Sequence, residues 1–279
     1  MGLTLAYEVV DVFTDTPYAG NPLAVVLDAD DLTTEQLQAI AREFNLSETA
    51  FPLAAPEGAT YGLRIFTPAT ELPFAGHPSV GAAWLLHRLG RIDAGPNVQA
   101  CGAGFIPVSV SAHGATLTGG AVTLSEPLDP APLLAAVGLT ERDMVAEPLR
   151  AGAGLEWTYL MVLRASLARI QVDHEAVRAL GGNGLAVVCN YDGDIRMRVF
   201  ASGIGVGEDP ATGSAALGLG VYFGESWADG DHAFDISQGA EVGRPSRLSV
   251  TVRNEGGQVV RTTVTGSVVP VARGEIAVP

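Results

Sequence analysis

The hydropathy pattern contains one stretch that is apolar on every side when it is wound as a helix. Residues Val206–Phe223 begin with an acidic pair and a proline, pass through Thr212, Gly213 and Ser214, and continue in small and apolar residues. A helix without a polar face is buried in a protein core. The threonine, glycine and serine suit its N-terminal cap, so the pattern predicts a buried helix that starts with polar residues.

A buried helix start of this kind has two interpretations. The first N–H groups of a helix have no partner inside it, and together with the helix dipole they attract an anion. The same residues are equally typical of a core helix with an ordinary cap. The stretch alone therefore leaves both an anion site and a plain cap open.

The residues from Glu71 to Leu86 repeat this pattern at a constant offset of 137 positions. The aligned pairs are Glu71 with Glu208, Pro73 with Pro210, Gly76 with Gly213, His77 with Ser214 and Gly81 with Gly218. Upstream, an R-I-F triplet matches an R-V-F triplet at an offset of 134. A strand, a loop and a buried helix thus occur twice, with three more residues in the second loop.

The repeat predicts two similar lobes with buried helices over Ser79–Leu89 and Ala215–Phe223, each presenting its N-terminus to a shared cleft. A repeat this long is neither a solenoid nor a propeller. The segment between Glu126 and Leu134 contains P-L-D-P-A-P, which is typical of a linker. We expect an N-terminal lobe over residues 1–125 and a C-terminal lobe over residues 126–267. The final strand, residues 268–279, can return to the first lobe.

The rest of the chain alternates between short apolar strands and turns rich in glycine. Thr33 or Thr34 can cap a helix that carries Leu37 and Ile40 on one face and ends at Asn45. The fold class predicted from these elements is α+β, with antiparallel strands wrapped round a central helix in each lobe.

Composition narrows the range of partners. The 279 residues carry a net charge of −15 with a pI near 4.6, and 47% of them are hydrophobic. Nucleic acids and anionic membranes are bound by basic patches, so neither is an expected partner. No apolar run reaches the roughly 18 residues of a membrane span, and the N-terminus does not resemble a signal peptide. We expect a cytoplasmic protein.

The sequence gives no indication of a metal or a cofactor. Cys101 and Cys189 are 88 residues apart and belong to no C-x-x-C or Cys/His cluster. The glycines of Gly203–Gly207 lack the G-x-G-x-x-G spacing of a dinucleotide loop, which makes a nucleotide-binding module a poor interpretation. No lysine context for a Schiff base is present.

Glu48 is the first candidate for acid–base chemistry. It stands at the start of a predicted strand among apolar neighbours, where a carboxylate would be partly desolvated. Desolvation raises the pKa of a carboxylate towards that of a working base. A solvated glutamate at a helix-to-strand turn fits the same local pattern, and this alternative stays open.

Five motifs in a fixed order add a resemblance to these observations. They are D-V-F-x-x-x-P-x-x-G-N-P-L-A-V-V, N-x-S-E-T-x-F, F-x-G-H-P, E-D-P-A-T-G-S-A and Q-G-x-x-x-G-R-P-S. The order covers nearly the whole chain and resembles the PhzF-type phenazine-biosynthesis family, which has the diaminopimelate-epimerase-like fold. The resemblance implies two related lobes, each a barrel-like sheet around a central helix, and a homodimer. It also implies an isomerase that shifts a proton, without cofactor or metal, in trans-2,3-dihydro-3-hydroxyanthranilate or a similar small carboxylate.

The resemblance also implies roles for single residues. Glu48 corresponds to the acid and base, while His77, Asp209 and Ser214 correspond to polar residues around the substrate. His77 and Asp209 are counted with Glu48 as catalytic candidates. A single carboxylate in a dry site can take a proton at carbon and return it elsewhere, which agrees with this assignment.

The two helix starts are the expected binding site for the substrate carboxylate. Gly76 and Gly213 fall at these starts, where backbone N–H groups could hold an anion. The predicted binding residues are Gly76, Ser79, Thr212, Gly213 and Ser214.

Other activities remain as alternatives. Racemases of the same fold use a cysteine at each helix start, but the corresponding positions here are Ala75 and Thr212. A serine hydrolase could combine Ser79 or Ser214 with His77 and Asp209, although no G-x-S-x-G elbow is present. A family member that binds a small molecule without turnover is the third alternative.

Overall fold

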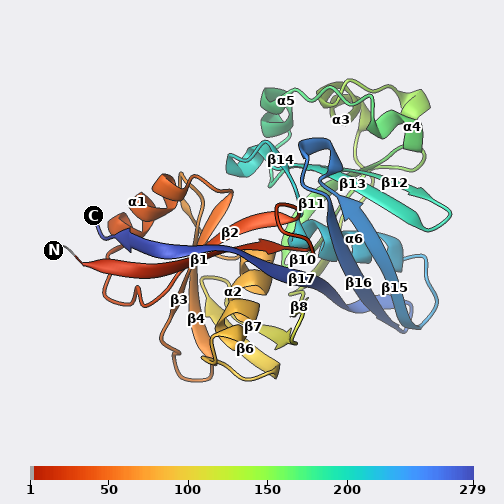
Figure 1. Cartoon of the computed structure of the whole chain (residues 1–279). Helices are drawn as coiled ribbons and strands as arrows, with labels where there is room; N and C mark the ends of the chain where they lie inside the picture. The colour runs from red at the N-terminus through yellow and green to blue at the C-terminus, as the bar shows by residue number, and fades with distance from the viewer. Residues whose placement is uncertain (1–2) are drawn as a thin grey trace. The chain divides into compact units, whose positions relative to one another are not determined.

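The computed structural model describes residues 3–279, and the chain folds into two compact units (Figure 1). Unit 1 comprises the residues up to Thr118 together with Thr265–Pro279, and unit 2 comprises Gly119–Val264. The sequence predicts these boundaries after residues 125 and 267. The two termini lie side by side in unit 1, because Thr4 is paired with Ala277.

The strands of unit 1 form a closed ring. In the order of their pairing, they are β1 (Thr4–Val12), β2 (Asn21–Val26), β3 (Glu48–Leu53), β4 (Tyr61–Phe66), β6 (Gly95–Cys101), β7 (Gly104–Val110), β8 (Gly114–Thr118) and the unit 1 part of β17 (Gln258–Ala277), which pairs with β1. The β2–β3 and β4–β6 pairs are parallel. The two-residue strand β5 (Glu71–Leu72) pairs with β4 and leads into the central helix.

Helix α2 (Gly76–Arg88) fills the ring of unit 1 and contacts β1, β2, β3, β7 and β8 (Figure 1). Its residues up to Leu86 are all buried, as the absence of a polar face predicts. A Cβ at Gly81 would lie 2.7 Å from Leu23 Cδ2 and 2.8 Å from Val12 Cγ2. A residue without a side chain therefore lets the helix approach β1 and β2 closely.

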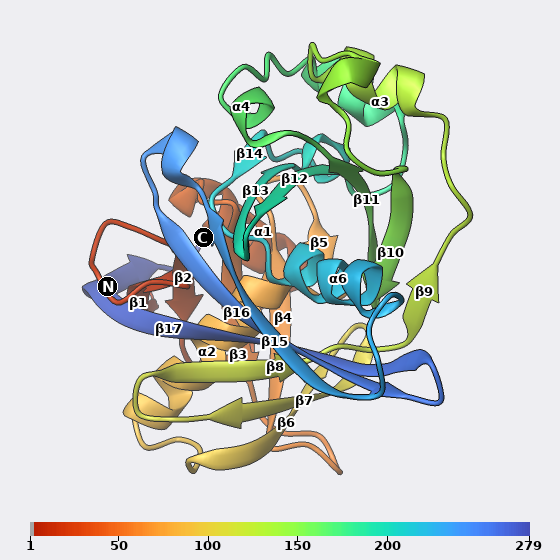
Figure 2. The same ribbon diagram turned by 90° about the vertical axis from the view of Figure 1, so that its right-hand side faces the viewer.

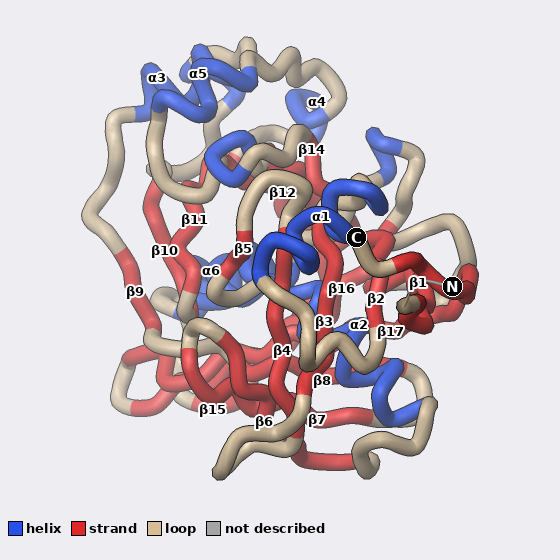
Figure 3. Tube along the Cα trace, turned by 90° about the vertical axis from the view of Figure 1, so that its left-hand side faces the viewer, coloured by secondary structure: helices blue, strands red, loops and turns tan. Residues whose placement is uncertain are grey.

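Helix α1 (Thr34–Phe44) covers the outer face of β3 and β4 (Figure 3). Its N-cap Thr33 forms a capping box with Gln36, and the helix ends at Asn45 in the left-handed conformation. The predicted helix, its threonine cap and its end at asparagine are confirmed. Its apolar face packs on Phe51 and Phe66.

Unit 2 repeats the arrangement of unit 1. Its strands are β9 (Val122–Leu124), β10 (Leu149–Ala153), β11 (Leu155–Met161), β12 (Leu185–Tyr191), β13 (Asp194–Phe200), β15 (Gly230–Gln238), β16 (Ser246–Glu255) and the first residues of β17. The β11–β12 and β13–β15 pairs are parallel, at the same places in the order as in unit 1. The short β14 (Glu208–Asp209) pairs with β13 as β5 pairs with β4.

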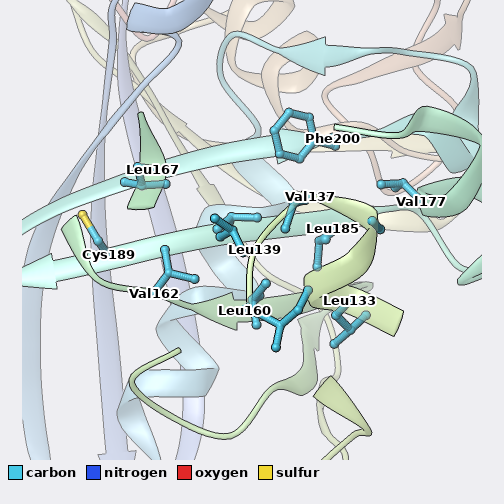
Figure 4. Close-up of a cluster of buried hydrophobic side chains, with 13 residues drawn as sticks. Leu133, Val137, Leu139, Leu160, Val162, Leu167, Val177, Leu185, Cys189 and Phe200 are labelled. Carbon is cyan, nitrogen blue, oxygen red and sulfur yellow. The ribbon is translucent and has the colours of Figure 1, made fainter. Parts of the chain in front are cut away.

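Helix α6 (Gly213–Gly224) is the central helix of unit 2 and contacts β9, β10, β11 and β16 (Figure 2). An outer layer of short helices covers the other face of β11, β12 and β13 (Figure 4). The layer consists of α3 (Pro130–Ala136), η1 (Glu141–Asp143), α4 (Arg164–Leu167) and α5 (His174–Ala179). Two further single turns are η2 (Ser202–Ile204) and η3 (Ala240–Val242).

The α+β fold and the repeated sheet-around-helix arrangement are thus confirmed. The central helices begin earlier than predicted, at Gly76 instead of Ser79 and at Gly213 instead of Ala215. Their N-cap residues, Ala75 and Thr212, make no side-chain capping bond. Of the residues assigned to the second cap, Thr212 occupies the N-cap position without capping through its side chain, and Gly213 and Ser214 belong to the first turn of the helix.

Candidate active site

Glu48 is the first residue of β3 and lies beside Leu23 of the parallel strand β2. Only 6% of the residue is exposed. The alternative of a solvent-exposed glutamate at a turn is therefore wrong. A buried carboxylate at a strand end is a group that can exchange a proton with a bound molecule while bulk water is kept away.

His77 lies next to Glu48, with its Nε2 3.6 Å from Glu48 Oε2. The imidazole is buried, at 4% exposure, in the first turn of α2. Burial lowers the pKa of His77 from 6.5 to about 3, so the ring is neutral at neutral pH. The contact is therefore one between a neutral imidazole and a carboxyl group, and it is no ion pair.

Two polar residues that the sequence analysis did not single out lie on the other side of His77. The side-chain nitrogen of Asn21 is 3.3 Å from His77 Nδ1, and the Ser47 hydroxyl donates to Asn21 Oδ1 at 3.1 Å. Asn21 stands in the G-N-P motif, and Ser47 precedes Glu48 in N-L-S-E-T. In the sequence, their place inside two of the five motifs was the feature that could have identified these two residues.

The start of α2 offers two backbone donors. The N–H of Ser79 bonds Ala75 O at 3.4 Å, and Pro78 has no N–H. The N–H groups of Gly76 and His77 are therefore the ones without an intrahelical acceptor. They lie in the same turn as the imidazole, so unit 1 combines a buried acid, a neutral histidine and two N–H donors.

Ser79 has a different environment from the one expected. It is fully buried, its hydroxyl donates to Ala75 O at 2.8 Å, and it accepts from Gln99 Nε2 at 3.0 Å. Gln99 in turn accepts from the buried Tyr61 hydroxyl at 3.1 Å, and burial raises the pKa of that phenol. This network ties the helix start to β4 and β6, which favours a structural role for the Ser79 side chain.

Asp209 ends β14 in unit 2 and is 7% exposed. The Thr212 hydroxyl donates to Asp209 Oδ2 at 2.5 Å, so it does not cap the helix that follows. Gln238 holds this arrangement through three bonds: its Nε2 donates to Asp209 O and to Thr212 Oγ1, and its Oε1 accepts from the Thr212 N–H. Gln238 was not singled out from the sequence.

The start of α6 offers three backbone donors. The first intrahelical bond runs from the Ala216 N–H to Thr212 O at 2.9 Å. The N–H groups of Gly213, Ser214 and Ala215 therefore lack an intrahelical acceptor. Ser214 is buried, and its hydroxyl accepts from Trp157 Nε1 at 3.0 Å.

The structure thus brings Glu48, His77 and Gly76 together in unit 1, and Asp209, Thr212, Gly213 and Ser214 together in unit 2. The structure gives no support to the contact between a serine hydroxyl and a histidine that a serine hydrolase needs. Ser79 is bound to Ala75 and Gln99 instead of to His77, as described above. Within residues 3–279 no group of three or more His, Cys, Asp or Glu side chains could hold a metal ion.

Unit 2 also contains a cavity of about 530 Å³ that is lined by none of these residues. Its apolar lining includes Phe223, Trp227 and Phe234. Asp235 at its rim is paired with Arg247. None of the residues that line it is a histidine. In the part of the chain that the structure describes, no helix is long and apolar enough to cross a membrane.

Comparison with known proteins shows the family of the chain. The model of the phenazine biosynthesis-like protein family matches residues 10–274. An uncharacterised isomerase from Mesorhizobium japonicum is 38% identical over 98% of this chain and 99% of its own length. The trans-2,3-dihydro-3-hydroxyanthranilate isomerase of Pseudomonas aeruginosa is 33% identical over 96% of this chain and 98% of its own. A Bacillus anthracis phenazine biosynthesis protein of the PhzF family superposes with a TM-score of 0.89 at 26% identity, covering 98% and 99% of the two chains.

Proposed function

This chain belongs to the phenazine biosynthesis-like protein family, and from that premise we propose that Glu48 moves a proton within a small carboxylate-bearing ring compound. Like the relatives named above, the chain is an isomerase. The observation that carries the assignment of Glu48 is its burial beside a neutral imidazole, at 3.6 Å between Oε2 and Nε2.

A proton shift needs one group that takes a proton from one atom and returns it to another. A single carboxylate does both when the site excludes water, because the proton it has taken is not lost to solvent between the two steps. The neutral His77 does not compete with Glu48 for that proton, since its pKa lies near 3. In this proposal Glu48 is therefore base and acid in turn.

Negative charge develops on the substrate while the proton is bound to Glu48. The N–H groups of Gly76 and His77 at the start of α2 are suited to stabilise that charge, because they lack intrahelical partners and lie at the positive end of the helix dipole. The neutral ring of His77 adds a further donor or acceptor beside Glu48.

We assign substrate binding to the N–H groups of Gly213 and Ser214, and the positioning of polar substrate groups to Asp209 and Thr212. Three N–H groups without an intrahelical acceptor at one helix start are a common anion site. The expectation that both helix starts serve one substrate stays a prediction. The substrate of the relatives at 33% identity, trans-2,3-dihydro-3-hydroxyanthranilate, is the first compound to test.

The sequence supports chemistry without a Schiff base, because all 16 residues of the Lys and Arg class are arginine and lysine is absent. We further propose a homodimer, which light scattering of the purified protein tests directly. The cytoplasmic location expected from composition stays a prediction.

The deciding experiment is Glu48→Gln, assayed with trans-2,3-dihydro-3-hydroxyanthranilate in D₂O. We expect turnover and deuterium incorporation to fall about a hundredfold or more, while ligand affinity measured by calorimetry stays within about threefold. The matched control is Glu57→Gln, because Glu57 is exposed in the loop before β4. Wild-type turnover in Glu48→Gln would overturn the assignment.

The same assay separates catalysis from binding alone. A wild-type protein that binds the compound without incorporating deuterium would be a non-catalytic member of the family for that compound. Binding that is lost in Glu48→Gln but not in Glu57→Gln would place the carboxylate in ligand recognition instead of proton transfer.

A further inference from the structure

The ring of His77 has a defined neighbour at each of its two nitrogens. Nε2 is 3.6 Å from Glu48 Oε2, and Nδ1 is 3.3 Å from the side-chain nitrogen of Asn21. Asn21 is completely buried at the start of β2, and Ser47 precedes Glu48 at the start of β3. All four residues belong to unit 1, so the contacts lie within one compact unit.

The hydrogen bonds of Asn21 decide which ring nitrogen carries the proton. The Ser47 hydroxyl donates to Asn21 Oδ1 at 3.1 Å, which turns the amide NH₂ group towards His77. An NH₂ group can only donate, so Nδ1 must accept and carries no hydrogen. A neutral imidazole has one N–H, which then lies on Nε2, the nitrogen that faces Glu48.

We propose that Asn21, oriented by Ser47, is a positioning residue that holds His77 as the Nε2–H tautomer and makes it a hydrogen-bond donor beside Glu48. The tautomer follows from the contacts alone. Its catalytic consequence rests on the proposed function, in which Glu48 is the base.

As a consequence, Glu48 and His77 have different roles in the reaction. An N–H directed at Glu48 favours the carboxylate form, which is the form that abstracts a proton. The same N–H prevents Nε2 from acting as a base towards the substrate. The distance of 3.6 Å is longer than a hydrogen bond, and such contacts commonly tighten when the substrate is bound.

A reversed amide makes the opposite prediction. If Asn21 presented its oxygen to Nδ1, the ring would carry its hydrogen there, and Nε2 would face Glu48 with a lone pair. Ser47 would then have to accept from the amide. The orientation of the Asn21 amide, the tautomer of His77 and the direction of the Ser47 hydroxyl thus depend on one another. A measurement of which His77 nitrogen carries the hydrogen therefore determines all three.

The test is the nitrogen NMR of the full-length protein labelled only at its five histidines, with His77→Gln identifying the His77 signals. At pH 7.5 we expect an unprotonated Nδ1 and a protonated Nε2. Asn21→Asp replaces the donor by a pure acceptor of the same shape, so the hydrogen should move to Nδ1 or the ring should become charged. A wild-type ring with its hydrogen on Nδ1, or unchanged nitrogen signals in Asn21→Asp, would overturn the proposal.

Two substitutions of Ser47 provide a second test in case Asn21→Asp does not fold. Ser47→Ala removes the hydroxyl that orients the amide and should produce a mixture of tautomers, whereas Ser47→Thr keeps the hydroxyl and should restore the wild-type signals. Identical nitrogen signals in all three proteins would also overturn the proposal.

The kinetic readout distinguishes this inference from the proposed function. With trans-2,3-dihydro-3-hydroxyanthranilate, we expect Asn21→Asp and Ser47→Ala to lower kcat about tenfold or more with little change in KM, and Ser47→Thr to recover it. If Glu48→Gln is inactive but Asn21→Asp keeps the wild-type rate, the function stands and the positioning role fails. If Glu48→Gln is fully active, the proposed function fails and the nitrogen signals still decide the tautomer.

Discussion

Arg64 of unit 1 and Arg198 of unit 2 occupy the same place in the repeat and share two kinds of contact. Each arginine binds a glutamate of the following short strand through two nitrogens, Glu71 at 2.7 Å and Glu208 at 2.6–2.7 Å. Each guanidinium also lies over the phenylalanine two residues further on, 5.1 Å and 5.2 Å from the ring centroids. The frame that carries the two central helices is therefore the same in both units.

The side chains on that frame differ. At the offset of the repeat, Asp209 of unit 2 replaces Leu72, Thr212 replaces Ala75 and Ser214 replaces His77. Unit 2 therefore carries a carboxylate held by a hydroxyl and three N–H groups without an intrahelical acceptor, whereas unit 1 carries an imidazole and two such N–H groups. This difference is consistent with the proposed function, which assigns substrate binding to unit 2 and proton transfer to unit 1.

The position of Glu48 shows the difference most clearly. Thr49 lies opposite Phe66, and Leu185 lies opposite Phe200, so Glu48 corresponds to Gly184 of unit 2. A Cβ at Gly184 would lie 2.1 Å from Phe200 O, and its φ of +149° is one that side chains rarely adopt. The equivalent position of unit 2 therefore cannot carry a carboxylate, and the two units differ at this point.

The largest expected effect concerns the glycine in each central helix. A Cβ at Gly218 would lie 2.4 Å from Tyr159 Oη and 2.8 Å from Ala151 O, whereas the atoms nearest to a Cβ at Gly81 are methyl carbons of Leu23, Val12 and Val10. We expect Gly218→Ala to cost about 3 kcal/mol or more and Gly81→Ala about 1–2 kcal/mol, because methyl groups can move and a backbone carbonyl cannot. Urea unfolding monitored by hydrogen exchange measures the loss in the free energy of unfolding of each unit. Equal costs would mean that the two helices are packed alike.

The next effect is the acid sensitivity of unit 1. Burial lowers the pKa of His77 from 6.5 to about 3, so below pH 6.5 the unfolded chain binds a proton that the folded chain does not. Stability is then lost as the pH falls from about 6.5 to 3, by roughly 2 kcal/mol at pH 5. His77→Gln should remove that part of the pH dependence, which unfolding midpoints at pH 7.5 and pH 5 measure. An unchanged pH dependence would show that other groups cause it.

Much of the fold could be predicted from the sequence, because the central helices and the repeat depend on local sequence patterns. The two helices are apolar on all sides, and the repeat with its R-x-F triplets is visible at a fixed offset, so the sheet-around-helix architecture follows. The cap at Thr33 and the end at Asn45 are likewise local features, and both are confirmed.

The remaining features depend on contacts between distant segments. Glu48 is buried because β2 lies beside β3, which its neighbours in sequence do not show. Thr212 has the residue type of a cap, but the nearby Asp209 competes for its hydroxyl. Gln238 reaches Thr212 from 26 residues away, and Asn21 reaches His77 from 56, so the motifs that contain Gln238 and Asn21 could not indicate these contacts.

A smaller effect separates binding from proton transfer. Asp209→Asn should raise KM about tenfold and also lower kcat, because an amide is a poorer acceptor for the Thr212 hydroxyl that Asp209 holds. Glu48→Gln, by contrast, should lower kcat alone. Asp31→Asn is the control, since Asp31 is exposed. An unchanged KM in Asp209→Asn would contradict the assignment of substrate positioning to unit 2.

The smallest effect concerns the two ion pairs, Arg64–Glu71 and Arg198–Glu208. The side chains of Arg198 and Glu208 are each 12% exposed, whereas those of Arg64 and Glu71 are 27% and 37% exposed. Water and salt screen the more exposed pair, so Glu71→Gln should cost only about 0.3 kcal/mol, and less in 1 M salt.

Glu208→Gln should cost about 1 kcal/mol with little dependence on salt, because the neutral amide leaves a largely buried guanidinium without its counter-charge. Arg198 would keep its bond to Leu167 O at 2.9 Å, which limits the loss. Urea midpoints at 0.1 M and 1 M NaCl for both variants measure the difference. If both variants lose the same stability with the same salt dependence, the two copies of the frame are equivalent in energy as well as in geometry, and only the residues around Glu48 and Asp209 distinguish the units.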